Sequence, residues 1–156
     1  MIRITLSGNA QRALERMPDE LGWALDRAIS RTAQEGAVFM KQELARQNLA
    51  ATSLLINSVA AEAVEPLSWR FGPHVEHGWY VYQGRRPGGR MPPIQAIRDW
   101  VQTKRLGDER IAWAIARKIQ RDGTPPRDYV TPTQAFAEQR LQTLADDAVR
   151  TVTGAA

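Results

Sequence analysis

Residues 21–47 read "LGWALDRAISRTAQEGAVFMKQELARQ" and form the longest regular pattern in the 156-residue chain. Apolar and small residues recur in this stretch at spacings of three and four, which is the period of one helix face. These positions are Leu21, Leu25, Ala28, Ile29, Thr32, Gly36, Phe39, Met40 and Leu44. The pattern predicts a long amphipathic helix that begins near Pro18 and ends at about Asn48.

Short runs of β type lie on both sides of this stretch in the sequence. "MIRITL" at the start alternates apolar and polar residues, as a half-buried strand does, and "AQRALERM" after it predicts a short helix capped by Asn9. Three later runs, "VAAEAVE", "LSWRFGP" and "WYVYQ", are separated by turn residues. They predict an antiparallel meander in which residues 79–83 form the third strand.

The second half of the chain predicts three helices, which begin at Pro93, Asp108 and Pro132. Their apolar faces contain Ile94, Ile97, Trp100 and Val101 in the first, Ile111, Ile115 and Ile119 in the second, and Ala137, Leu141, Leu144 and Ala148 in the third. We therefore expect an α+β fold, with a small antiparallel sheet packed on the long helix and completed by a helix pair and a C-terminal helix. Residues 1–156 should form a single domain whose tail frays at about 151–156.

The composition is that of a globular protein, with 43% hydrophobic and 24% charged residues. Cysteine is absent, so the fold uses neither disulfides nor thiolate metal sites. The N-terminus lacks the apolar core of a signal peptide, and no apolar run approaches the roughly 18 residues that a membrane helix needs. We expect a soluble protein that is made in the cytoplasm.

Positive charge is concentrated in one block of the sequence. Residues 85–121 hold ten Lys or Arg and three Asp or Glu, a net charge of +7, whereas residues 1–84 carry −1 and residues 122–156 carry −2. The block begins with "GRRPGGR", in which three arginines stand among glycine and proline. This composition predicts a flexible, basic loop over residues 84–92.

The sequence offers little evidence for catalysis. His74, Glu76 and His77 lie close together in "PHVEHG", but on a strand His77 would point away from the other two, and zinc requires three or four converging ligands. No phosphate-binding glycine motif or nucleophile motif is present. We predict no catalytic residues, no metal and no cofactor. A small hydrolase or nuclease that depends on His74 or His77 is the rival hypothesis.

Nucleic-acid binding is the alternative function. The basic side chains of the block could follow a phosphate backbone, and Trp79, Tyr80 and Tyr82 could stack on bases. The basic candidates outside the loop are Arg98, Lys104, Arg105, Arg117, Lys118 and Arg121. However, the order of strands and helices fits no recognised nucleic-acid-binding module.

A protein partner is the third explanation for the loop. Loops of this composition on a rigid scaffold commonly become ordered when they dock. In this interpretation Gly84, Gly88 and Gly89 supply backbone freedom, while Arg85, Arg86 and Arg90 supply charge-assisted hydrogen bonds. Five tryptophans are many for this length, and some could lie at subunit contacts. The expected structural anchors are Tyr80, Trp100, Gly123 and Tyr129, the last of which would fix the final helix.

Four features of the chain resemble the minor tail protein Z and related tail-completion proteins of long-tailed bacteriophages and prophages. The first is the opening strand and short helix followed by the long Ala-rich helix quoted above. The second is "HGWYVYQGRRPGG", which is similar to a tyrosine-containing strand ending in a glycine loop. The third is "MPPIQAIRDWVQTKRL", which resembles a Pro-Ile, Trp-Val helix. The fourth is "AWAIARKIQRDGTPPRDYVTPTQAF", with its Gly-Thr-Pro turn and aromatic anchor.

The resemblance spans nearly the whole chain and implies a non-enzymatic role in the virion. Proteins of this family act at the neck, where a finished tail joins a DNA-filled head. It implies a homo-oligomeric ring, often sixfold, in contact with the connector or stopper and with tail-terminator or tail-tube proteins. The basic loop would then face either genomic DNA in the channel or an acidic surface of a neighbouring ring. Assembly would take place in the host cytoplasm.

Overall fold

A computed structural model describes residues 1–5, 19–49 and 54–154 of the chain. Its fold is α+β, as predicted, and the expected short helix capped by Asn9 lies outside the described residues. The elements in chain order are β1 (Ile2–Thr5), α2 (Asp19–Arg46), α3 (Leu54–Asn57), β2 (Val59–Glu65), β3 (Ser68–Pro73), α4 (His77–Gln83), α5 (Ile94–Thr103), α6 (Glu109–Asp122) and α7 (Val130–Thr153). None of the described helices is both long enough and apolar enough to cross a membrane.

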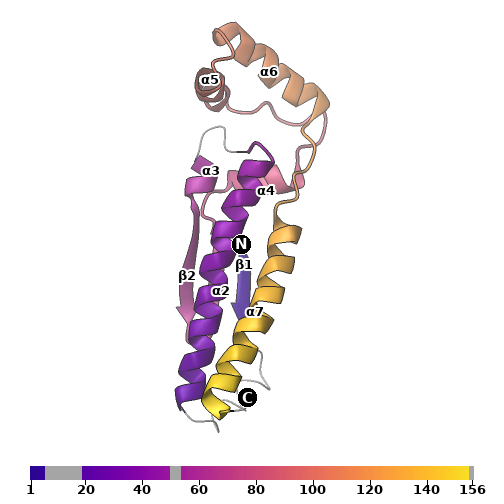
Figure 1. Cartoon of the computed structure of the whole chain (residues 1–156). Helices are drawn as coiled ribbons and strands as arrows, with labels where there is room; N and C mark the ends of the chain where they lie inside the picture. Colours follow the sequence, from indigo (N-terminus) through magenta and orange to yellow (C-terminus); the bar gives the residue numbers. More distant parts are fainter. Residues whose placement is uncertain (6–18, 50–53, 155–156) are drawn as a thin grey trace.

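The elements form an elongated body with two helices mounted at one end (Figure 1). In the body, the antiparallel helices α2 and α7 lie side by side, and α2 packs against the three-stranded sheet. The helices α3 and α4 lie at the end of the body from which α5 and α6 project. We call α5 and α6 the helix pair.

The sheet is antiparallel and has the strand order β1-β3-β2. The hairpin of β2 and β3 is as predicted. The third strand of the sheet, however, is the opening strand β1, in which Ile2 pairs with Phe71 of β3. Residues 79–83 are not a strand, because they lie in α4. Alternating aromatic and aliphatic residues satisfy the period of a strand, but packing decides the conformation here: in α4, Gly78 is buried and Tyr82 packs edge-on to Tyr129.

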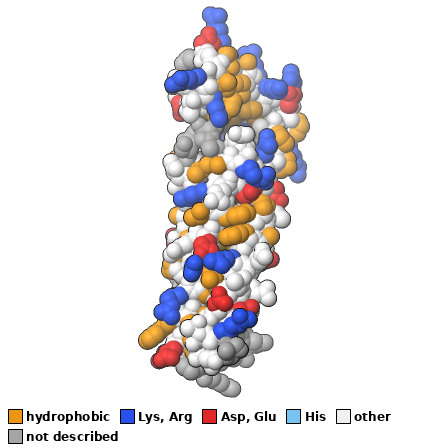
Figure 2. Space-filling model, viewed as in Figure 1, with side chains coloured by type: hydrophobic (Ala, Val, Ile, Leu, Met, Phe, Trp, Pro, Cys, Tyr) orange, Lys and Arg blue, Asp and Glu red, His pale blue; other side chains and the backbone are white. Residues whose placement is uncertain are grey.

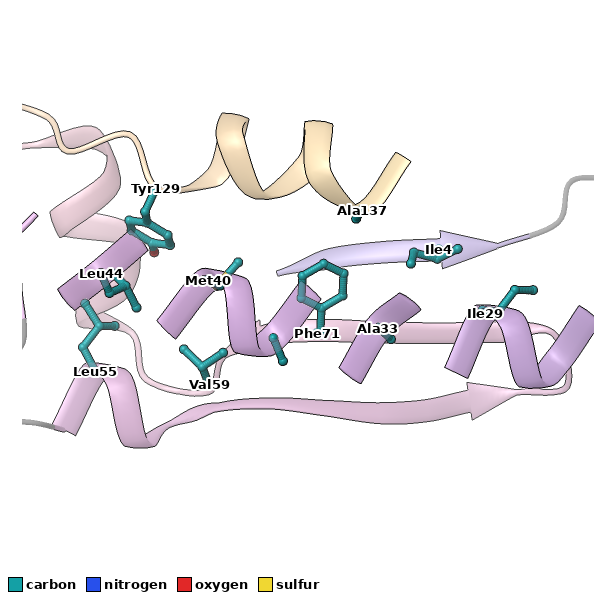
Figure 3. Close-up of a cluster of buried hydrophobic side chains, with 11 residues drawn as sticks. Ile4, Ile29, Ala33, Met40, Leu44, Leu55, Val59, Phe71, Tyr129 and Ala137 are labelled. Atoms are coloured by element: carbon teal, nitrogen blue, oxygen red, sulfur yellow. The ribbon is translucent and has the colours of Figure 1, made fainter. Parts of the chain in front are cut away.

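The core lies between the sheet and the two long helices (Figure 3). Phe71 of β3 is fully buried at its centre, close to Met40 and Ala33 of α2 and Ala137 of α7. A Cβ atom on Gly36 would lie 2.6 Å from Cζ of Phe71. Gly36 therefore allows α2 to approach the phenylalanine ring, and this outweighs the cost of a glycine inside a helix.

Side chains also connect α2 with α7 along their exposed seam. Arg140 of α7 donates two hydrogen bonds to the carboxylate of Glu35, at 2.5 and 3.2 Å. The hydrogen bond from Arg140 and that from Arg31 lower the pKa of Glu35 to about 2. Phe39, which the sequence placed on the apolar face of the helix, is half-buried at the seam, where its ring stacks on Phe136 with centroids 4.4 Å apart.

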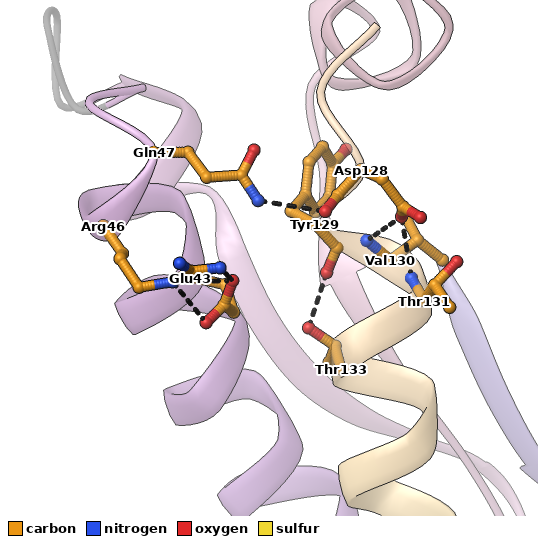
Figure 4. A network of polar contacts seen from close by, with 8 residues as sticks. All are labelled: Glu43, Arg46, Gln47, Asp128, Tyr129, Val130, Thr131 and Thr133. Carbon is orange, nitrogen blue, oxygen red and sulfur yellow. Dashed lines mark hydrogen bonds and ion pairs between the residues drawn. The ribbon is translucent and has the colours of Figure 1, made fainter.

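The start of α7 is also held by Asp128, a residue that the sequence did not single out (Figure 4). The Asp128 carboxylate accepts hydrogen bonds from the backbone N–H groups of Val130 (3.1 Å) and Thr131 (2.9 Å), and the bond from Thr131 is the main cause of its lowered pKa. The helix therefore begins two residues before Pro132, where we predicted its start. It continues to Thr153, so half of the expected fraying tail is helical.

The helix pair differs from its prediction in one respect. Asp108 caps α6 as predicted, by accepting a hydrogen bond from the N–H of Arg110. However, the residues of α6 that are fully buried are Ala112 and Ala116, whereas Ile111 is exposed. The small side chains of Ala112 and Ala116 let α5 and α6 approach closely, while Ile115 and Ile119 are only half-buried.

Candidate docking surface

Two chain segments, residues 84–93 and 123–129, connect the helix pair with the body, and we call them the neck. Within the neck, Arg85 and Thr124 exchange two backbone hydrogen bonds, at 2.9 and 3.0 Å. The N–H of Gly88 donates to the carbonyl of Gln120 at 2.8 Å, and that of Arg127 to the carbonyl of Val81 at 3.1 Å. The predicted flexible loop is thus held by backbone pairing with a segment that is distant in sequence.

Two glycines make this pairing sterically feasible. Gly84 and Gly123 both have φ of +72°, in the left-handed region that favours glycine. A Cβ atom on Gly123 would lie 2.2 Å from the carbonyl oxygen of Arg85, and one on Gly84 would lie 2.5 Å from that of Thr124. Gly88 also has positive φ, but it borders open space. Gly84 and Gly123 therefore allow the two segments to approach each other closely, in addition to giving the backbone conformational freedom.

The three arginines of the predicted docking loop fall into two groups. Arg85 is half-buried, and its guanidinium donates to the carbonyl of Arg90 at 2.9 Å, so it supports the neck. The side chains of Arg86 and Arg90 are exposed, and neither forms an ion pair with any described residue. Gly89 lies between them and is exposed as well. Docking through this loop would therefore depend on Arg86 and Arg90.

The helix pair packs mainly on itself and has no extensive interface with the described parts of α2, α7 or the sheet. Its basic residues gather around apolar side chains at this end of the molecule (Figure 2). Of the six predicted there, Arg98 is half-buried, Arg121 is paired with Asp122, and Lys104, Arg105, Arg117 and Lys118 are exposed. The structure thus brings most of the predicted basic residues to one end of the molecule.

Two hollows lie beside the neck. A groove of about 1660 Å³ separates the helix pair from the body and is lined mostly by apolar side chains, among them Val81, Met91, Ile97 and Trp100. A second hollow of about 760 Å³ is lined by Trp79, Tyr80, Tyr82, Arg85, Arg86 and neighbouring residues. Aromatic and guanidinium groups therefore meet at the neck, which is the arrangement that interface anchors favour.

The predicted anchors differ in their surroundings. Tyr129 is only 3% exposed, and its hydroxyl donates to the carbonyl of Gly78 at 2.9 Å, which ties the start of α7 to α4. Trp100 is half-buried and lines the groove. Tyr80 is 59% exposed, so it is not packed in the core as Tyr129 is, and it lines both hollows. It lies on the outer side of α4, a position that the predicted strand did not anticipate.

The histidine segment does not form a strand. His74 follows β3, and its ring lies 3.0 Å from the carbonyl oxygen of Ser58 and 3.3 Å from a carboxylate oxygen of Glu62. Glu62 also pairs with Arg70 of β3. Among the described residues, no three histidine or acidic side chains are grouped closely enough to hold a metal ion. His74 thus belongs to the polar outer side of the sheet.

Comparison with known protein families finds no matching family, and comparisons with curated proteins and with solved structures find no match either.

Two residues of this end of the molecule were missed by the sequence analysis. Thr124 pairs with Arg85 in the neck, and Arg110 adds another exposed cation to α6. Arg110 could have been found, because it lies three and seven residues before Trp113 and Arg117, at helical spacing. Thr124 could not, because nothing in "DGTPPRDY" indicates which distant segment it meets.

Proposed function

We propose that this protein is a structural virion protein of a long-tailed bacteriophage. It lies at the neck of the virion, which is the junction of head and tail, or at the tail top. There it completes the tail and joins it to the DNA-filled head as part of a ring. Three of the four resembling features support this proposal. The first falls on α2 and the third on α5. The fourth covers α6, the neck segment 123–129 of this chain and the start of α7. The second feature lends less support, because its tyrosine-containing segment is helix α4 and not a strand.

The observation that carries the proposal is the end-mounted helix pair. The neck holds it away from the body, and its exposed cations have no ion-pair partners among the described residues except at Arg121. In contrast, five arginines of the body form ion pairs within it: Arg3, Arg31, Arg46, Arg70 and Arg140. Unpaired charge on a projecting module is suited to an external surface, such as a connector, stopper or tail-terminator ring.

Electron microscopy of lysates tests this role. We expect a stop codon in the gene to yield filled heads and free full-length tails that are not joined. Expression of the wild-type chain from a plasmid should restore whole virions. Intact virions in the stop-codon lysate would rule out the joining function.

Nucleic-acid binding remains the second candidate, because the same exposed cations could contact phosphates. It predicts tight binding to plain duplex DNA, with an affinity that falls steeply as salt rises. A joining protein should bind plain duplex weakly. A binding titration at several salt concentrations separates the two functions.

A further inference from the structure

The outer face of α6 carries a tryptophan between two arginines. Arg110, Trp113 and Arg117 follow one another at spacings of three and four, so they lie on one side of the helix. All three are exposed, Trp113 to 44%, and neither arginine forms an ion pair with a described residue. Leu106 and Ile111 add exposed apolar surface nearby. This face of α6 has no partner among the described residues.

The opposite end of the body also exposes a tryptophan, and most of the described charged side chains there are acidic. There α2 begins and α7 ends (Figure 1). Trp23 is 67% exposed and follows Asp19 and Glu20 within one turn of α2. The last turns of α7 expose the two acidic residues Asp146 and Asp147 together with the apolar Val149 and one cation, Arg150, so that acidic side chains predominate among the residues described at this end. We call this surface the far end.

We propose that the α6 face of one copy docks on the far end of a second copy of this chain. The two surfaces match in chemistry, since each exposes a tryptophan and the α6 face is basic whereas the far end is mostly acidic. Because they are different surfaces, the contact is heterologous, and it generates either a closed ring or an open filament. The inference rests on the proposed function in that it names the surfaces that would meet in the proposed ring.

A second copy explains the α6 face better than nucleic acid does. A phosphate backbone would engage the arginines, but it would give no role to Leu106, Ile111 and Trp113. Arginine and tryptophan are, in contrast, the side chains most enriched at the centres of protein interfaces. The charge of the chain is also polarised: residues 85–121 carry +7, and the remaining residues together carry −3. Complementary charge of this kind steers two copies into one orientation.

Two charge reversals test the contact with the purified full chain. One variant carries Arg110→Glu and Arg117→Glu, and the other carries Asp146→Lys and Asp147→Lys. Arg110 lies in the first turn of α6, where Glu is favourable, and Arg117, Asp146 and Asp147 are exposed positions inside helices. Both variants should therefore keep their fold, which circular dichroism verifies.

Light scattering and sedimentation then measure self-association. We expect the wild type to form species above 17.5 kDa, and each variant alone to associate with an affinity roughly tenfold weaker or more. An equimolar mixture of the two variants should associate again, because the acidic α6 face of one meets the basic far end of the other. Raising the salt from about 0.1 M to about 1 M should weaken the wild-type contact, since the Debye length falls from about 10 Å to about 3 Å.

Several results would overturn the proposal. These are a wild type that remains at 17.5 kDa at every concentration, a far-end variant that associates like the wild type, and a mixture that stays monomeric. Loss of duplex DNA binding in the α6 variant, with unchanged self-association, would assign the face to nucleic acid instead. These measurements use purified protein and no phage, so they test self-association separately from the joining role. Failed self-association would overturn the proposed contact between copies. It would not overturn the joining role, which electron microscopy of lysates tests.

Discussion

At the scale of single residues, the neck depends on Gly123, which lies where two chain segments almost touch. Replacing Gly123 with alanine places a Cβ atom 2.2 Å from the Arg85 carbonyl oxygen, in a left-handed conformation. We expect a cost of about 3 kcal/mol, because backbone strain and a backbone clash act together. Amide hydrogen exchange should show that Arg85 and Thr124 lose their protection.

Gly88 provides a matched control for this substitution. Its φ of +74° is nearly the same, but no atom lies within 4 Å of the added Cβ. Gly88→Ala should cost only about 1 kcal/mol and leave the exchange of Arg85 and Thr124 unchanged. Equal effects of the two substitutions would show that conformational strain, and not close approach, explains Gly123.

Tyr129 is the second residue whose contribution can be isolated. Tyr129→Phe removes the buried hydrogen bond to the Gly78 carbonyl and should lower the free energy of unfolding by about 1 kcal/mol. Tyr80→Phe is the control, because that side chain is exposed, and we expect a change within about 0.5 kcal/mol. Urea unfolding measures both, and a larger effect at Tyr80 would contradict the assignment of the anchor.

At the scale of elements, the long helix α2 was predictable because its apolar stripe repeats over many turns and is buried along its length. The helix α4 was not, since the run from Trp79 to Tyr82 suits a strand equally well and only contacts with distant residues select the helix. The candidate site was predictable in composition alone: the sequence identified most of its arginines, although not Arg110. It could not reveal that Arg85 supports the neck, because that role depends on pairing with Thr124.

The ion pair between α2 and α7 gives these elements a pH dependence. Because the pKa of Glu35 is lowered to about 2, the pair stabilises the fold above the unfolded-state pKa of about 4.3, and this contribution is lost as the pH falls towards 2. Glu35→Gln should therefore lower the free energy of unfolding by about 1 kcal/mol at pH 7, a modest value because the pair is partly exposed. Denaturant unfolding should show this difference shrinking below about pH 4. A difference that stays constant at low pH would contradict the assignment.

At the scale of the whole molecule, the chain forms a body and a projecting helix pair, on which Lys104, Arg105, Arg110, Arg117 and Lys118 are exposed and form no ion pair with a described residue. The arginines of the neck must then be separated by role. Arg86→Ala with Arg90→Ala should leave the free energy of unfolding within about 0.5 kcal/mol of the wild type, because both side chains are exposed. Arg85→Ala should instead loosen the neck, because it removes the hydrogen bond to the Arg90 carbonyl.

The joining role is tested by complementation of a stop-codon lysate with purified protein, with joined particles counted by electron microscopy. We expect heads and tails to stay separate without added protein and to join when the wild type is added. We also expect the Arg86→Ala, Arg90→Ala double variant to join far fewer particles at the same concentration, although it is folded. Virions that are already intact before addition, or a double variant that joins as well as the wild type, would contradict the proposed role of this protein and of its two exposed arginines.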